Sequence, residues 1–130
     1  STMLKTLDER LARRREIQRR LDEALGGLGP AVIVPRRDPK NPETVSLYML
    51  LAENRDRLLG HLVANGVEAK IHYPIPLHLQ QAAASLGFGP GSMPIAEKQA
   101  DRLVTLPAHE YLSWTEVEYM IELVNGLEWA

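Results

Sequence analysis

The chain has 130 residues, which fits one domain, and its 45% hydrophobic and 25% charged residues are ordinary for a globular protein. A net charge of -2 gives no overall attraction to nucleic acid or to an anionic membrane, and no apolar run reaches the roughly 20 residues of a membrane span. The absence of cysteine excludes disulfides, thiolate metal sites and thiol nucleophiles. We expect a cytoplasmic protein that binds neither nucleic acid nor membranes.

The chain opens with a leucine-rich segment that predicts one long helix. Apolar residues recur between Leu4 and Leu28 at spacings of mostly three, four or seven, the period of one helix face. The glycines and the proline of residues 26–30 end this helix. Residues 1 and 2 offer only a weak N-cap, so the helix is already under way where the sequence begins. This pattern suggests a chain cut from a longer one.

The middle of the chain reads as strand, helix and strand. Apolar and β-branched runs predict strands at residues 31–34 and 44–50. Asn54 is a suitable N-cap for the helix that follows, and residues 65–66, Asn-Gly, close it. Apolar and polar residues then alternate along residues 67–73, which is the pattern of a half-buried strand.

The last third is predicted to be mostly helical. We expect a short helix over residues 77–86, a second one starting at Pro94, an extended piece at 104–107 and a last helix opened by the capping box at 113–116. Together these elements predict a single α+β domain over residues 1–130. Its sheet has three or four mostly antiparallel strands, flanked by helices, with the long helix in front, as a small α/β layer.

Motifs for catalysis and for metal or phosphate binding are missing from the sequence. Its four histidines form neither an H-x-x-x-H nor an H-E-x-x-H pair. Ser85, Ser92 and Ser113 lack a nucleophile elbow, and the glycine-rich residues 87–91 contain a proline and follow a predicted helix, unlike a phosphate-binding loop. We therefore expect no metal site, no catalytic residue and no cofactor-binding residue in this chain.

Six arginines lie in the first helix, where a basic stripe could bind nucleic acid. Five acidic residues are interleaved with them, and no aromatic side chain lies among them for stacking on bases. The pattern favours a solvated helix face, or a face docked on another domain.

Residues 70–80 carry two histidines separated by two prolines. In a strand, His72 faces away from Ile71 and Tyr73, because successive side chains alternate. Pro74 ends the ladder, since proline has no N–H to donate. The segment is therefore either a surface histidine beside a half-buried tyrosine, or a strand end where an imidazole and a phenol hold a polar ligand.

Residues 67–80, VEAKIHYPIPLHLQ, with Gly66 in front of them, resemble the G-[IV]-x-x-x-x-H-Y-P-x-P-x-H-x-Q signature of the pyridoxal-phosphate-dependent nucleotide-sugar aminotransferases, the DegT/StrS family. The likeness continues along almost the whole chain in family order. Residues 7–17 resemble its LDE…RRREI helix, 55–58 its RD-x-L stretch, 94–98 its P-x-A-E motif and 106–109 its LP-x-H motif. The chain departs from the family at Gln81, where proline is common.

The resemblance implies that the chain is the C-terminal small domain of a fold-type I aminotransferase. Such an enzyme transfers an amino group, commonly from glutamate, to a nucleotide-linked keto sugar. His72 and Tyr73 match the motif's His-Tyr pair, which implies that they line the nucleotide-sugar pocket as hydrogen-bonding groups. His78 matches a nearby substrate-binding position.

The same resemblance implies what is missing. None of the four lysines, Lys5, Lys40, Lys70 and Lys98, lies in the setting of the family's cofactor-bonding lysine, which belongs to a large domain. We expect pyridoxal phosphate in the full-length parent and none on this chain, which is inactive alone. Surface left uncovered by the missing large domain predicts self-association, so we expect a homodimer. The alternative is a free-standing sugar-nucleotide-binding or regulatory module without catalysis.

Overall fold

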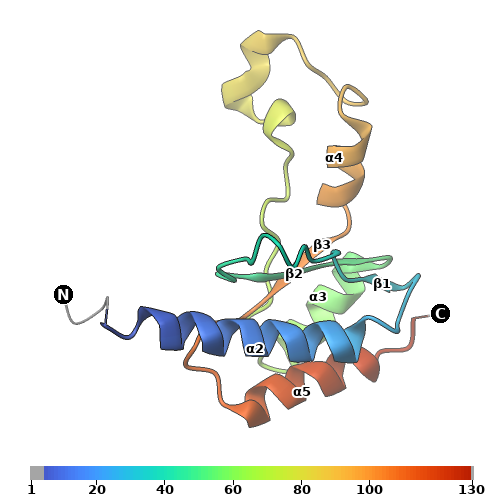
Figure 1. Ribbon diagram of the computed structural model, residues 1–130. Helices are drawn as coiled ribbons and strands as arrows, with labels where there is room; N and C mark the ends of the chain where they lie inside the picture. The colour runs from blue at the N-terminus through green and yellow to red at the C-terminus, as the bar shows by residue number, and fades with distance from the viewer. Residues whose placement is uncertain (1–4, 130) are drawn as a thin grey trace.

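The structure is a computed structural model and describes residues 5–129 (Figure 1). Helices and a small sheet make up its body, and a long arm projects from the sheet. In chain order, the elements are α2 (Leu7–Leu25), β1 (Val32–Ile33), β2 (Tyr48–Ala52), α3 (Arg55–Ala64), the 3₁₀ helices η1 (Leu77–Leu79) and η2 (Gln81–Leu86), α4 (Pro94–Ala100), β3 (Leu103–Leu106) and α5 (Trp114–Asn125). No helix within residues 5–129 is both long and apolar enough to cross a membrane.

The sheet is antiparallel, with β2 in the centre between β1 and β3. Val32 pairs with Ala52, and Tyr48 pairs with Leu106. Helices α2 and α5 run along one face of this sheet (Figure 1). The predicted α+β fold, with a three-stranded antiparallel sheet and a long first helix, is confirmed.

The hydrophobic core fills the space between the helices and the sheet. Alternate residues of β2 and β3 point into it, because strand side chains alternate between faces. Its fully buried members include Ile17, Leu21 and Leu25 of α2, Leu58 and Leu62 of α3, Leu50, Val104 and Leu106 of the sheet, and Val117 and Val124 of α5. Burying such side chains stabilises the fold by roughly 1.5–3 kcal/mol each.

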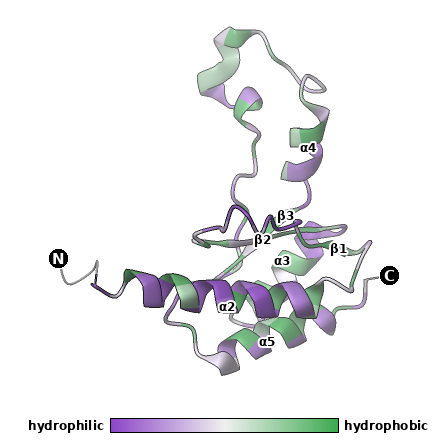
Figure 2. Cartoon of the chain, in the orientation of Figure 1, coloured by the Kyte–Doolittle hydropathy of each residue, from purple (hydrophilic) through white to green (hydrophobic). Residues whose placement is uncertain are grey.

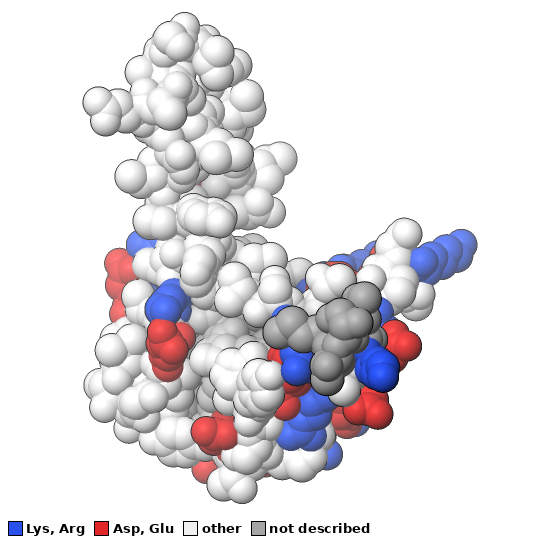
Figure 3. Space-filling model, turned by 90° about the vertical axis from the view of Figure 1, so that its left-hand side faces the viewer, with Lys and Arg blue, Asp and Glu red and all other residues white. Residues whose placement is uncertain are grey.

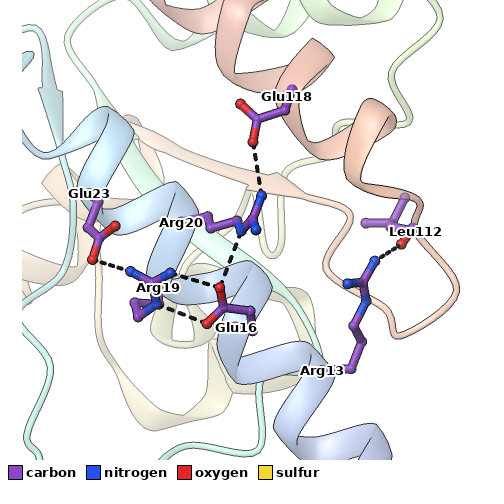
Figure 4. A network of polar contacts seen from close by, with 7 residues as sticks. All are labelled: Arg13, Glu16, Arg19, Arg20, Glu23, Leu112 and Glu118. Atoms are coloured by element: carbon purple, nitrogen blue, oxygen red, sulfur yellow. Dashed lines mark hydrogen bonds and ion pairs between the residues drawn. The ribbon is translucent and has the colours of Figure 1, made fainter.

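The arginines of α2 are used to dock α5 of the same chain. The guanidinium carbons of Arg13 and Arg20 lie 3.3 and 3.9 Å from the centre of the Trp114 ring, so both cations stack on this one ring. Arg13 also donates to the Leu112 carbonyl at 2.7 Å, and Arg20 pairs with Glu118 at 3.3 Å (Figure 4). Part of this face therefore packs on α5 of the same chain, while Arg19 and Glu23 stay exposed to solvent, as the charge pattern had suggested.

Most predicted helix ends are confirmed. The Asn54 side chain accepts from the Arg57 N–H, and Ser113 and Glu116 form both halves of a capping box. Gly66 has a φ of 80°, the left-handed conformation that glycine tolerates best. The predicted cap at residues 1–2 lies outside the described residues.

The predicted strand at residues 67–73 is wrong. Only Lys70 forms a bridge, with Thr105 of β3. The Ala69 N–H donates to the Val67 carbonyl at 2.8 Å, and this tight local turn prevents a regular ladder before Lys70. The third strand of the sheet is instead β3, which the sequence showed as a short extended piece.

The predicted single helix over residues 77–86 is also wrong. Two 3₁₀ helices replace it, and Gln80 between them is extended, with φ -72° and ψ 148°. No residue of either helix is buried. A short helix is marginal without packing on a partner surface, and this segment lies at the far end of the arm, away from α2 and α5 (Figure 1), which explains the broken geometry.

Candidate functional site

The arm, residues 74–100, extends from the sheet on the side opposite α2 and α5 (Figure 1). No lysine, arginine, aspartate or glutamate lies between Lys70 and Glu97 in the sequence. The space-filling view accordingly shows the arm without charged atoms on the face displayed (Figure 3). Hydrophobic residues recur along it (Figure 2), and several are exposed, including Leu77 at 78% and Ile95 at 75%.

An apolar groove of about 710 Å³ opens between the arm and the sheet. Its floor is the outer face of the sheet, formed by Ile33, Met49, Leu51 and Leu103. These residues alternate with the core-facing ones, so the two faces of one small sheet serve the core and the groove separately. The arm and Tyr73, which precedes it, supply the walls, with Tyr73, Ile75, Leu77 and His78 on one side and Met93, Ala96 and Gln99 on the other.

Tyr73 and His78, two of the predicted substrate-binding residues, line this groove. Tyr73 is 73% exposed. The His78 side chain is 8% exposed, and its Nε2 lies 2.9 Å from a Glu97 carboxylate oxygen. The groove therefore combines a large apolar surface with few polar groups, as small-molecule pockets commonly do.

His72, the third predicted residue, lies instead in a separate polar hollow of about 190 Å³. Polar side chains from several segments surround this hollow, namely Ser46, Glu68, Lys70, His72, Thr105 and His109. Lys70 pairs with Glu68, and this hydrogen bond and charge lower the pKa of the Glu68 carboxyl below its usual range. An anion and a cation are thus both displayed at the rim of the hollow.

The His72 ring is fixed by Thr105. Its Nδ1 lies 2.8 Å from the Thr105 hydroxyl oxygen, and this hydroxyl donates its single proton to the Lys70 carbonyl at 3.0 Å. Nδ1 must therefore be the donor of the pair. The neutral ring then leaves Nε2 unprotonated, so that it can accept a hydrogen bond from a ligand hydroxyl.

The structure thus divides the three predicted residues between two hollows. His72 and Tyr73 are neighbours whose ring centres are 6.0 Å apart and edge-on, but each lines a different cavity. Sequence reasoning missed Thr105, a buried polar residue, and Glu97, the partner of His78. A lone threonine in the apolar run Val-Thr-Leu was the available signal for the first, and the P-x-A-E motif was the signal for the second.

The similarity of this sequence to known proteins identifies its family. The model of the DegT/DnrJ/EryC1/StrS aminotransferase family matches residues 1–125. The chain belongs to this family. It is 37% identical over 123 residues to the erythromycin biosynthesis sensory transduction protein EryC1 of Saccharopolyspora erythraea, a match covering 95% of this chain and 33% of that protein. It is 36% identical over 106 residues to dTDP-3-amino-3,4,6-trideoxy-alpha-D-glucose transaminase of Streptomyces venezuelae, covering 82% of this chain and 26% of the enzyme.

A solved structure agrees with these matches. The crystal structure of S. venezuelae DesV in complex with a ketimine intermediate superposes with a TM-score of 0.89 at 32% identity, over 95% of this chain and 33% of that one. The chain therefore spans about a third of the length of the relatives it matches. Their fold over this third is the fold described above.

The family implies pyridoxal phosphate, but the described residues do not fit it. A lysine that bonds this cofactor needs a desolvated setting or a neighbouring cation to make its amine reactive. Lys5, Lys40, Lys70 and Lys98 are all exposed. Residues 5–129 also hold no group of three or more histidine, aspartate or glutamate side chains placed to bind a metal ion. What the chain offers is hydrogen-bonding groups and an apolar wall.

Proposed function

We propose that this chain is the C-terminal small domain of a pyridoxal-phosphate-dependent aminotransferase that moves an amino group, commonly from glutamate, to a nucleotide-linked keto sugar. The observation that carries this proposal is the family match over residues 1–125, combined with a span of about a third of the relatives' length. The name of the S. venezuelae relative, a dTDP-sugar transaminase, supports the substrate class. The remaining part of the enzyme supplies the cofactor lysine and the chemistry of group transfer.

In this proposal the chain binds and orients substrate. His72 offers Nε2 as an acceptor, and the exposed Tyr73 phenol offers both a donor and an acceptor to a sugar hydroxyl or to the nucleotide. His78 reaches a ligand through Nδ1, since its Nε2 is held by Glu97. The arm excludes water from one side of the reacting sugar, as closing elements do in many enzymes.

The test compares this chain with the natural polypeptide that contains it. Each is incubated with pyridoxal phosphate, glutamate and a dTDP-linked keto sugar, and the amino-sugar nucleotide is measured by mass spectrometry. We expect product from the longer polypeptide, one equivalent of 2-oxoglutarate per product, and none from the 130-residue chain. Turnover by the chain alone, or none by a longer polypeptide, contradicts the proposal.

Cofactor binding is checked separately on the chain itself. Because all four lysines are exposed, we expect no saturable Schiff-base absorbance when stoichiometric pyridoxal phosphate is added. A saturable band removed by substituting one of the four lysines contradicts this expectation.

A regulatory module without catalysis is the second candidate. One observation favours it: the S. erythraea relative is named as a sensory transduction protein. Under this alternative the natural polypeptide is no longer than this chain, and a dTDP-sugar binds to it without being converted. Isothermal titration of the chain with a dTDP-sugar, beside the turnover assay above, separates the two candidates.

The homodimer and the cytoplasmic location belong to the same proposal. Exposed apolar side chains on the arm, such as Leu77, Leu86 and Ile95, support association with a protein surface. Sedimentation equilibrium of the chain tests the dimer, and a monomer at high concentration contradicts it. Cell fractionation tests the location.

A further inference from the structure

The Glu97 carboxylate accepts hydrogen bonds from several segments of the arm. One of its carboxylate oxygens accepts from His78 Nε2 at 2.9 Å and from the Met93 N–H at 3.1 Å. The Gly91 N–H donates to both oxygens, at 3.0 and 2.9 Å. Bonds to a charged carboxylate are stronger than those between neutral groups. Three segments of the arm, η1, the loop 87–93 and α4, therefore meet at one side chain.

The bond between His78 and Glu97 joins two parts of the arm that no other hydrogen bond among residues 5–129 joins. Within this described part of the chain, the other hydrogen bonds of the first limb, residues 74–86, stay inside that limb or reach only the residue next to it, as the one from Gln80 to Ile75 does, and the bond from Gly89 to Ser92 stays inside the loop. The first limb of the arm contains His78 in η1, and the second limb, α4, contains Glu97. Breaking the pair leaves a largely exposed arm with no other hydrogen bond between described residues to fix the distance between its limbs.

The same two limbs are the walls of the apolar groove. Leu77 lies next to His78 on one wall, and Ala96 lies next to Glu97 on the other. The width of the groove therefore depends on the pair. We propose that Glu97, held by His78, is a positioning residue that sets the width of the substrate groove without touching substrate. The part of this inference that concerns substrate rests on the proposed function.

Hydrogen exchange at single amides tests the arm without using activity. Glu97→Ala removes every acceptor, and we expect exchange at the Gly91 and Met93 amides to rise at least about tenfold. The Leu58 amide, which donates to the Asn54 carbonyl at the start of α3, reports whether the body stays folded, and its exchange does not change. Glu118→Gln, a charge-removing change on α5, is the matched control and leaves all three amides as they are.

His78 is tested by loss and rescue. His78→Leu removes the donor and raises exchange at Gly91 and Met93. His78→Gln puts a side-chain N–H near the position of Nε2 and restores part of the protection. Unchanged exchange at Gly91 and Met93 in both Glu97→Ala and His78→Leu overturns the inference. A His78→Gln variant that keeps Leu58 protected and restores no protection at Gly91 and Met93 also overturns it.

The substrate part is tested in the active polypeptide that contains this chain. Glu97→Gln keeps the size of the side chain, and we expect KM for the dTDP-linked keto sugar to rise about tenfold while kcat is little changed. If exchange at the Gly91 and Met93 amides becomes faster in Glu97→Gln but KM does not change, the proposal that Glu97 positions the substrate groove is wrong. A wild-type polypeptide that shows no transaminase activity overturns the proposed function instead, and the exchange data still decide whether Glu97 fixes the arm.

Discussion

His72 Nδ1 lies 2.8 Å from the hydroxyl oxygen of Thr105, and that hydroxyl is already committed as a donor to the Lys70 carbonyl. This relationship fixes the tautomer of His72 and leaves Nε2 as the acceptor offered to a ligand. It also anchors the segment that leads into the arm to β3, through the one bridge that this segment forms. A buried threonine thus serves both the fold and the candidate site.

Thr105→Val removes the hydroxyl and keeps the shape of the side chain. We expect the neutral His72 ring to hold its proton on Nδ1 in the wild-type chain and to shift toward the Nε2–H tautomer in the variant, since Nδ1 loses its acceptor. Nitrogen-15 NMR of the ring at about pH 8 measures the tautomer. Thr115→Val on α5 is the control. An Nε2–H tautomer in the wild-type chain contradicts the assignment.

The arm should respond to acid through Glu97. Hydrogen bonds from the Gly91 N–H and from His78 lower the pKa of the Glu97 carboxyl below its usual range. Its contribution to stability is therefore fully present above the ordinary value of 4.5 and is lost as the pH falls through the lower, folded-state pKa. The Met93 amide shift, followed by NMR, should titrate below pH 4.5 and lose this transition in Glu97→Gln. A midpoint at or above 4.5 contradicts the lowered pKa.

Trp114 should contribute much of the stabilising free energy of the contact between α2 and α5. Trp114→Ala removes a half-buried ring and leaves Arg13 and Arg20 stacked on nothing. We expect a loss of about 2–3 kcal/mol in the free energy of unfolding, below the full cost for a buried tryptophan. Urea denaturation measures it. Tyr111→Ala, at a side chain 73% exposed, is the control and should cost less than about 0.5 kcal/mol.

The role proposed for Tyr73 is tested in the active polypeptide. Tyr73→Phe removes only the phenolic hydroxyl, and we expect KM for the nucleotide sugar to rise about tenfold, the loss of one hydrogen bond. Tyr111→Phe is an equally exposed control and should change nothing. Equal kinetics for the two variants would show that Tyr73 does not contact substrate through its hydroxyl.

The helices of the body could be predicted because their signals are local. The leucine period of α2 and the Ser113–Glu116 capping box are written within a few residues each, and both appear in the structure. The strand predicted at residues 67–73 failed for the opposite reason. Alternation fits a strand, but pairing is decided by a partner far away in sequence, and β3 takes the place beside β2.

The candidate site was predictable only in part. Local motifs pointed to His72, Tyr73 and His78, but could not tell that they lie in two hollows, because the turn before Lys70 and the path of the arm separate them. The contacts with Thr105 and Glu97 span 33 and 19 residues, so no short pattern shows them.

The size of the natural polypeptide tests the central claim most directly. An antibody raised against this chain is used to blot an extract of its source cells. Because the chain spans 33% of the EryC1 relative, the account predicts a band at about three times the 14.6 kDa of this chain. A single band at 14.6 kDa would contradict it, and would mean that the chain works alone as a binding or regulatory module.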